Sequence, residues 1–102
     1  MKLKGYVRVG DPVPVSVQNL VIRDYCRRRG HVYLLSDVEF VWGGTSMWEG
    51  LMANLGNFDG VVAYSLFQVP RGTRCEKPIH FALEDYELPG DAEAVELAWM
   101  LK

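Results

Sequence analysis

An apolar run in the middle of the chain constrains the fold more than any other feature. Residues 59–71 read DGVVAYSLFQVPR, opening on a turn dipeptide and closing on polar side chains. The run shows no polar alternation, which is typical of a strand covered on both faces, as in parallel sheets flanked by helices. The sequence therefore predicts a buried central strand whose polar end, Ser65 to Arg71, lies where such sheets bind ligands.

Helical patterns are predicted on both sides of this strand. From Ser16, apolar side chains recur at helical spacing, arginines occupy the last turn, and Gly30 is placed to end the helix. A second helix is predicted from Ser46, which has the spacing of a capping box with Glu49. A third helix is predicted near the C-terminus, with Asp91 as its N-cap residue.

Three further strands are predicted at residues 3–9, 31–35 and 79–83. A chain of 102 residues fits one domain. The alternation of strands and helices predicts a single three-layer α/β domain, with a four-stranded, mainly parallel sheet and helices on both faces. We expect the strand order 2-1-3-4, as in resolvase-like and flavodoxin-like sheets, which makes the strands at 3–9 and 59–71 neighbours.

Composition excludes several classes of function. The formal net charge of -2 argues against a nucleic-acid binder whose affinity rests on phosphate neutralisation. No run approaches the roughly 20 apolar residues of a membrane span, and no apolar signal segment follows the N-terminus. Cys26 and Cys75 have no CxxC spacing and are predicted to be free thiols. We expect a cytoplasmic protein with no nucleic-acid partner, no membrane partner and no cofactor.

The predicted neighbours 3–9 and 59–71 would bring polar side chains to one crevice. Arginine side chains and the first N–H groups of the following helix suit a phosphate or a carboxylate. The alternative is that Arg8 and Arg71 form structural ion pairs with Asp37, Glu39 or Glu84. The residues predicted to bind a ligand are Arg8, Gly10, Asp11, Ser16, Gln18, Gln68 and Arg71.

Three side chains are candidates for catalysis. His80 and Glu84 are predicted on one face of the strand at 79–83, where they would transfer protons. Ser65 would be a nucleophile with His80 as its base, although no GxSxG motif surrounds it. The alternative is that His80 is a hydrogen-bonded core residue. His31 and His80 come from different strands and no spacing matches a zinc site, so the sequence predicts no metal site.

Four segments carry a resemblance to a known family. They are QNLVIRDYC at 18–26, YLLS at 33–36, DGVVAYSLFQVP at 59–70 and HFALE at 80–84. With these segments the chain closely resembles the sporadic carbohydrate cluster proteins, small bacterial proteins encoded among surface-glycan and sugar-nucleotide genes. The resemblance implies a role in carbohydrate biosynthesis. This chain departs from the family after residue 70, where members usually carry a longer, arginine-containing helix.

A weaker resemblance concerns the start of the chain. Tyr6-Val7-Arg8-Val9 is similar to the first strand of serine recombinase catalytic domains. Gly10 stands where those enzymes carry their nucleophilic serine. The resemblance therefore implies a related fold and no recombinase activity.

Together these patterns predict a small protein of carbohydrate or sugar-nucleotide biosynthesis. It would bind an anionic or polyol small molecule, a sugar or a sugar phosphate, with acid/base chemistry as a possible reaction. The alternative is a non-catalytic homo-oligomeric binding or scaffold subunit that assists a neighbouring enzyme. A dimer is expected through the C-terminal helix, which is apolar over more than one face.

Overall fold

The computed structural model describes residues 1–40, 43–73 and 75–90. Strands and helices alternate as far as the third strand, and two short strands follow. In chain order the elements are β1 (Lys2–Arg8), α1 (Val15–Arg29), β2 (Val32–Glu39), α2 (Ser46–Ala53), the 3₁₀ turn η1 (Leu55–Asn57), β3 (Gly60–Ala63), the 3₁₀ turn η2 (Leu66–Gln68), β4 (Ile79–Phe81) and β5 (Tyr86–Leu88).

The strands form one mixed sheet in the order β2-β1-β3-β4-β5. β1 pairs in parallel with β2 and β3, and β3 pairs in parallel with β4. The predicted α/β class and the order of the first four strands are confirmed. The prediction of a four-stranded sheet is wrong, because β5 adds an antiparallel edge strand.

A tight turn between β4 and β5 explains this difference. Asp85 has a φ of 55°, and its N–H donates to the carbonyl of Ala82 at 3.3 Å. The chain therefore reverses directly after Phe81 instead of extending the strand to residue 83. A strand of three residues such as β5 is too short to produce a recognisable periodic pattern.

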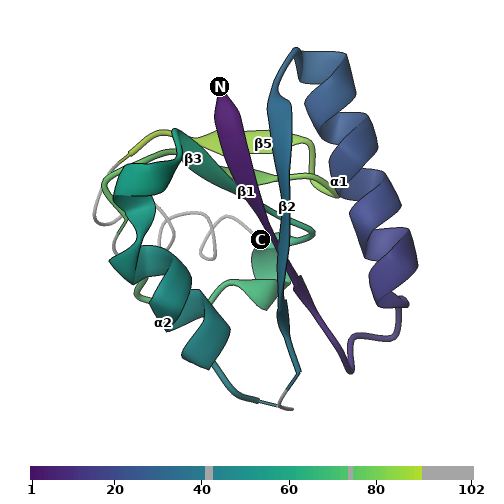
Figure 1. The fold of residues 1–102 in the computed structure, drawn as a ribbon. Coiled ribbons are helices and arrows are strands. Elements are labelled where there is room, and N and C mark those ends of the chain that lie inside the picture. The colour runs from purple at the N-terminus through teal and green to yellow at the C-terminus, as the bar shows by residue number, and fades with distance from the viewer. Residues whose placement is uncertain (41–42, 74, 91–102) are drawn as a thin grey trace.

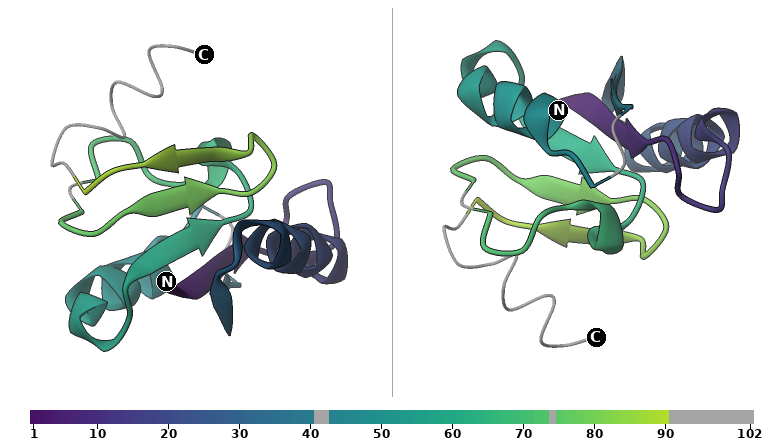
Figure 2. Two further views of the ribbon diagram at one scale, coloured as in Figure 1. Left: turned by 90° about the horizontal axis from the view of Figure 1, so that it is seen from above. Right: turned by 90° about the horizontal axis from the view of Figure 1, so that it is seen from below.

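Helices cover both faces of the sheet (Figure 1). Figure 2 shows α1 on one face and α2 on the other. On the α1 face, Ile22 and Tyr25 are buried with Val62 of the sheet. On the α2 face, the ring of Trp48 meets the ring of Tyr6 edge to face, with centroids 4.9 Å apart. This layered burial agrees with the predicted three-layer arrangement.

β3 lies inside the sheet, and all four of its residues are buried. This agrees with the predicted central strand covered on both faces. The strand is shorter than the apolar run, because it ends at Ala63 and η2 follows. The Ser65 hydroxyl caps η2 by accepting the N–H of Phe67 at 3.2 Å. The polar end of the run is therefore a turn at the edge of the sheet.

The two helices begin and end for different reasons. α1 ends, as predicted, at Gly30, which adopts a left-handed φ of 72°. The predicted capping box of Ser46 is wrong. Instead, the carboxylate of Glu39 at the end of β2 accepts the N–H groups of Met47 at 3.1 Å and Trp48 at 3.3 Å. A side chain outside the helix thus supplies the hydrogen-bond acceptors that the free N–H groups of the first turn of α2 require.

We expect Gly60→Ala to lower the free energy of unfolding by about 1–3 kcal/mol. A Cβ at Gly60 would lie 2.7 Å from the carbonyl oxygen of Pro78, a backbone atom that cannot rotate away. The matched control is Gly50→Ala in α2, where a Cβ would meet nothing within 4 Å. That variant should gain about 1 kcal/mol from helix propensity. Urea denaturation of both variants measures the difference, and equal shifts would contradict the close approach.

The predicted C-terminal helix, and the dimer contact expected through it, lie outside the described residues. Within the described ranges, neither helix has the length and apolar character needed to cross a bilayer.

Candidate functional site

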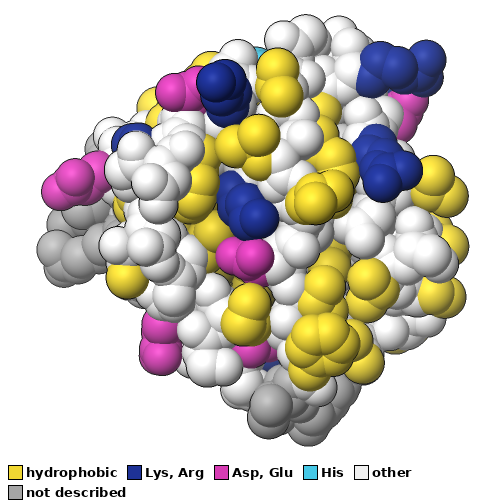
Figure 3. Space-filling view, viewed as in Figure 1, with side chains coloured by type: hydrophobic (Ala, Val, Ile, Leu, Met, Phe, Trp, Pro, Cys, Tyr) yellow, Lys and Arg dark blue, Asp and Glu magenta, His cyan; other side chains and the backbone are white. Residues whose placement is uncertain are grey.

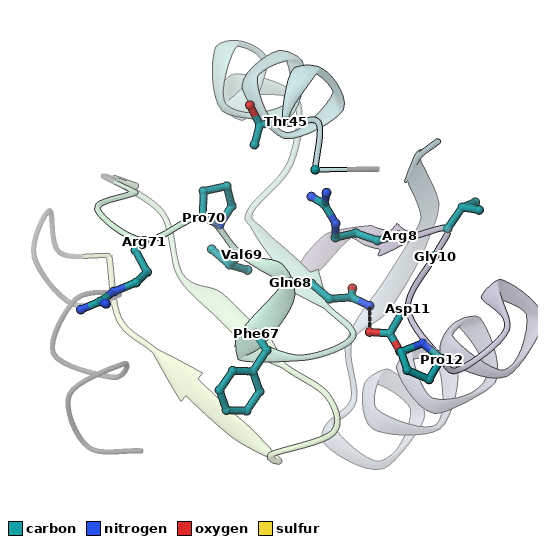
Figure 4. Close-up of a pocket in the computed structure, with 12 residues that line it drawn as sticks. Arg8, Gly10, Asp11, Pro12, Thr45, Phe67, Gln68, Val69, Pro70 and Arg71 are labelled. Atoms are coloured by element: carbon teal, nitrogen blue, oxygen red, sulfur yellow. Dashed lines mark hydrogen bonds between the residues drawn. The ribbon is translucent and has the colours of Figure 1, made fainter. Parts of the chain in front are cut away.

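A pocket of about 510 Å³ lies at the C-terminal ends of β1 and β3. Its walls come from the segment after β1, the segment before α2 and the segment after β3 (Figure 4). The adjacency of β1 and β3 brings these segments together, as the predicted strand order requires. We call this the β1/β3 pocket. Five of the residues predicted to bind a ligand line it: Arg8, Gly10, Asp11, Gln68 and Arg71.

A buried hydrogen-bonded chain holds Arg8 at the pocket. Its Nη1 donates to the Tyr6 hydroxyl at 2.9 Å, and that hydroxyl donates to Glu39 Oε1 at 3.1 Å. Tyr6 and Glu39 are fully buried. Burial raises the pKa of Tyr6, so the hydroxyl stays protonated and donates to the carboxylate. Tyr6 thereby orients the Arg8 guanidinium and connects it to the Glu39 carboxylate.

Gln18 lies beneath the pocket and connects its two walls. Its Nε2 donates to the carbonyls of Arg8 at 2.9 Å and Val13 at 2.8 Å. Its Oε1 accepts from the N–H of Arg8 at 3.2 Å and from Gln68 Nε2 at 2.9 Å. These four bonds use the full capacity of the amide. Gln18 therefore positions the pocket residues and has no group left to bind a ligand hydroxyl.

In the Gln68 side-chain amide, the nitrogen has hydrogen-bond partners and the oxygen has none among the described residues. Its Nε2 donates to Asp11 Oδ2 at 3.1 Å and to Gln18. Its Oε1 is buried and has no hydrogen-bond partner among the described residues. Figure 4 shows this oxygen on the Arg8 side of the amide, with the nitrogen directed at Asp11. A buried acceptor without a donor is uncommon and marks a place where a ligand group fits.

The second arginine of the pocket does not converge with the first. Arg71 is exposed, and Figure 4 shows its guanidinium directed away from Arg8. Ser16 is exposed on α1 and lies in a separate groove with Asn19 and Arg23. In the described part of the chain, the predicted anion site at the first turn of α1 is thus not part of the β1/β3 pocket.

Ser65 and Glu84 contact each other at the same edge of the sheet. The Ser65 hydroxyl donates to Glu84 Oε2 at 2.8 Å, and the N–H of Leu66 donates to Glu84 Oε1 at 2.8 Å. The carboxylate therefore fixes the start of η2, which carries Gln68. This arrangement gives both residues a positioning role beside the pocket.

His80 lies apart from these two residues, so the predicted acid/base pair and triad are not assembled. Its side chain faces α1, is fully buried, and places Nδ1 2.6 Å from the Tyr25 hydroxyl. Burial lowers the pKa of His80 to about 4, so the ring is neutral at pH 7. The prediction assumed that the strand continued to residue 84, but the turn after Phe81 directs Glu84 elsewhere.

Sequence reasoning missed the roles of Tyr6 and Glu39. From the sequence, Glu39 is predicted only as an alternative ion-pair partner for the arginines. A signal was present, since an acidic residue ends β2 a few residues before a predicted helix start. Its contacts with α2 and Tyr6 depend on the parallel pairing of β1 and β2, which brings Arg8 opposite Glu39.

The fold and the site define a class: α/β proteins with a ligand pocket at the C-terminal edge of a mainly parallel sheet. No protein-family model matches this chain, and neither a curated protein nor a solved structure shows significant similarity to it.

Proposed function

We propose that this protein binds a small hydroxylated anion, such as a sugar phosphate, in the β1/β3 pocket. The unpartnered, buried Oε1 of Gln68 beside the Arg8 guanidinium carries this proposal. A guanidinium suits a phosphate or carboxylate, and an amide oxygen accepts a hydroxyl. A ligand that presents both groups satisfies both side chains at once.

The size of the pocket supports a ligand of this class. A volume of about 510 Å³ lies within the usual range for small-molecule sites, about 300–1,000 Å³. The resemblance of four segments to sporadic carbohydrate cluster proteins implies the same ligand chemistry. The strand order and the Tyr6–Val9 segment further support a resolvase-like fold, in which Gly10 replaces the nucleophile.

Binding, rather than proton transfer, is the function that the site supports best. Asp11 is the carboxylate that lines the pocket in the described part of the chain, and both of its oxygens accept hydrogen bonds, from the N–H of Val13 and from Gln68. His80 lies on the α1 face with Tyr25. We therefore assign Arg8 and Gln68 to ligand binding, with Gln18 and Glu84 as positioning residues in a protein of carbohydrate or sugar-nucleotide biosynthesis.

A homo-oligomeric scaffold subunit is the second candidate. Large apolar side chains are exposed on α1 and along β2, where Leu20 is 61%, Leu35 68% and Phe40 72% exposed. Figure 3 shows hydrophobic side chains grouped over this face of the molecule. Exposed apolar surface of this kind favours self-association. A dimeric mass in sedimentation, combined with no response to any sugar ligand, would favour this candidate.

Titration with glucose 1-phosphate, glucose and inorganic phosphate tests the binding proposal. We expect glucose 1-phosphate to bind most tightly, because it presents both an anion and hydroxyls. Arg8→Ala should weaken glucose 1-phosphate and phosphate binding at least about tenfold, since a charge-assisted bond is lost. Gln68→Leu should reduce the preference for glucose 1-phosphate over phosphate while phosphate binding persists.

The control for this titration is Arg27→Ala, which removes an exposed arginine on α1 that pairs with Asp24. Isothermal calorimetry gives the affinities, and ¹H–¹⁵N spectra locate the binding site on the chain. Equal effects of Arg8→Ala and Arg27→Ala, or spectral changes that avoid Arg8 and Gln68, would refute the assignment of the pocket.

A further inference from the structure

Three potential metal ligands meet on the α1 side of the sheet, away from the β1/β3 pocket. They are His31, His80 and Glu87, and one coordinating atom from each lies within 4.8 Å of the other two. His31 directly follows the Gly30 cap of α1, and His80 and Glu87 are opposite one another in the β4–β5 pair. We call this group the histidine cluster. The chain brings it together from segments about fifty residues apart.

We propose that the histidine cluster binds a divalent transition-metal ion, with Zn²⁺ as the best match. Two imidazole nitrogens and one carboxylate oxygen form a ligand set that zinc commonly adopts. Three protein ligands leave a fourth tetrahedral position for water or a small anion. The sequence offered no such spacing, because the two histidines belong to different elements and only the turn after β4 places Glu87 beside them.

A ring nitrogen of His80 without a hydrogen-bond partner supports this site, independently of the distances between the three side chains. His80 is fully buried, and its Nε2 has no hydrogen-bond partner among the described residues. Its Nδ1 lies 2.6 Å from the Tyr25 hydroxyl, which fixes the orientation of the ring. Metal-binding histidines commonly have their second nitrogen held in this way. A metal ion would give the buried ring the partner that its protein surroundings lack.

The cluster needs a small contraction to enclose an ion. Zinc bonds of 2.0–2.2 Å place tetrahedral ligand atoms roughly 3.3 Å apart. Glu87 Oε1 lies 3.7 Å from His80 Nδ1, the ring nitrogen that contacts Tyr25, so the carboxylate must move toward Nε2 to share an ion with the ring. The Glu87 side chain is 42% exposed and can rotate. Two positive charges lie near the cluster: the Met1 ammonium, 3.3 Å from His31 Nδ1, and Arg29, which is paired with Asp85 at 2.9 Å. The movable ligand is therefore at the surface, and the rigid ligand is in the interior.

Calorimetric titration of Zn²⁺ into the full chain tests the proposal. The Met1 nitrogen lies 3.3 Å from His31 Nδ1, so an N-terminal tag would place extra residues beside the cluster. The titration therefore uses protein without such a tag. We expect saturable binding of one ion per chain. His31→Ala and Glu87→Gln should each weaken binding at least about tenfold. Glu76→Gln, which changes an exposed acid outside the cluster, should bind like the wild type.

Metal binding by buried His80 is tested by NMR on the wild-type protein, because a substitution at this position could unfold it. The chain contains two histidines, both in the cluster, so long-range ¹H–¹⁵N spectra report on each ring without ambiguity. Zn²⁺ should shift ring-nitrogen signals of both residues, and the pattern identifies which nitrogen binds. Unchanged histidine signals, the absence of saturable binding, or equal affinity in the wild type and both cluster variants would each overturn the proposal.

Discussion

Glu39→Ala is expected to lower the free energy of unfolding by about 3 kcal/mol or more. The buried Glu39 carboxylate accepts from the hydroxyls of Tyr6 at 3.1 Å and Ser46 at 3.4 Å, and from the N–H groups of Met47 and Trp48. Hydrogen bonds to a charged group are worth about 1.5–3 kcal/mol each, and their loss leaves buried donors unpaired. One substitution thus removes the cap of α2 and the support of Arg8.

Two further variants separate this effect from a general loss of a glutamate. Glu39→Gln keeps one acceptor oxygen and should cost less, about 1–2 kcal/mol. Glu49→Ala removes an exposed glutamate of α2 and should change stability by about 0.5 kcal/mol or less. Urea denaturation followed by circular dichroism ranks the three variants. A similar cost for Glu39→Ala and Glu49→Ala would show that Glu39 does not cap the helix.

Acid should destabilise the metal-free protein through His80. Burial lowers the pKa of His80 from 6.5 to about 4 in the folded state. Between these two values the unfolded chain binds a proton that the folded chain does not, so folding is opposed. The protein therefore has its full stability with respect to His80 above pH 6.5, and it loses roughly 3 kcal/mol of unfolding free energy as the pH decreases toward 4.

Unfolding free energies measured between pH 7 and pH 4 in the presence of a chelator test this expectation. The comparison is with His80→Leu, which fills the site with a group that does not titrate. This variant should be less stable at pH 7, because the Tyr25 hydroxyl loses its partner. Its stability should nevertheless fall less steeply with acid than that of the wild type. Parallel curves for the two proteins would exclude a neutral, buried His80.

His31, which is partly buried, provides the control for the pH experiment. Burial also lowers the pKa of His31. The side chain is less buried than that of His80, so His31→Ala should leave most of the acid sensitivity in place. Acid sensitivity lost equally in both variants would mean that the two rings titrate as one unit.

Local pattern was sufficient for the α/β class, for the buried central strand and for part of the site. The uniform apolar run predicted the buried centre of the sheet, and helical spacing before Gly30 predicted α1. Once strands and helices alternate, right-handed parallel connections leave few strand orders, and the order of flavodoxin-like sheets is the one that places β1 beside β3. The ends of those strands were therefore known to meet, which is why Arg8, Asp11 and Gln68 were correctly predicted to share one crevice.

Only the tertiary structure decided which side chains contact each other across the chain. Glu39 caps α2, Gln18 bonds to both walls of the pocket, and Glu84 holds Ser65, although nothing in their local sequence specifies these partners. The short hairpin after Phe81 moved Glu84 away from His80 and brought Glu87 toward it. Periodicity reports which face of an element is buried, whereas a hydrogen bond depends on where two separate elements end in space.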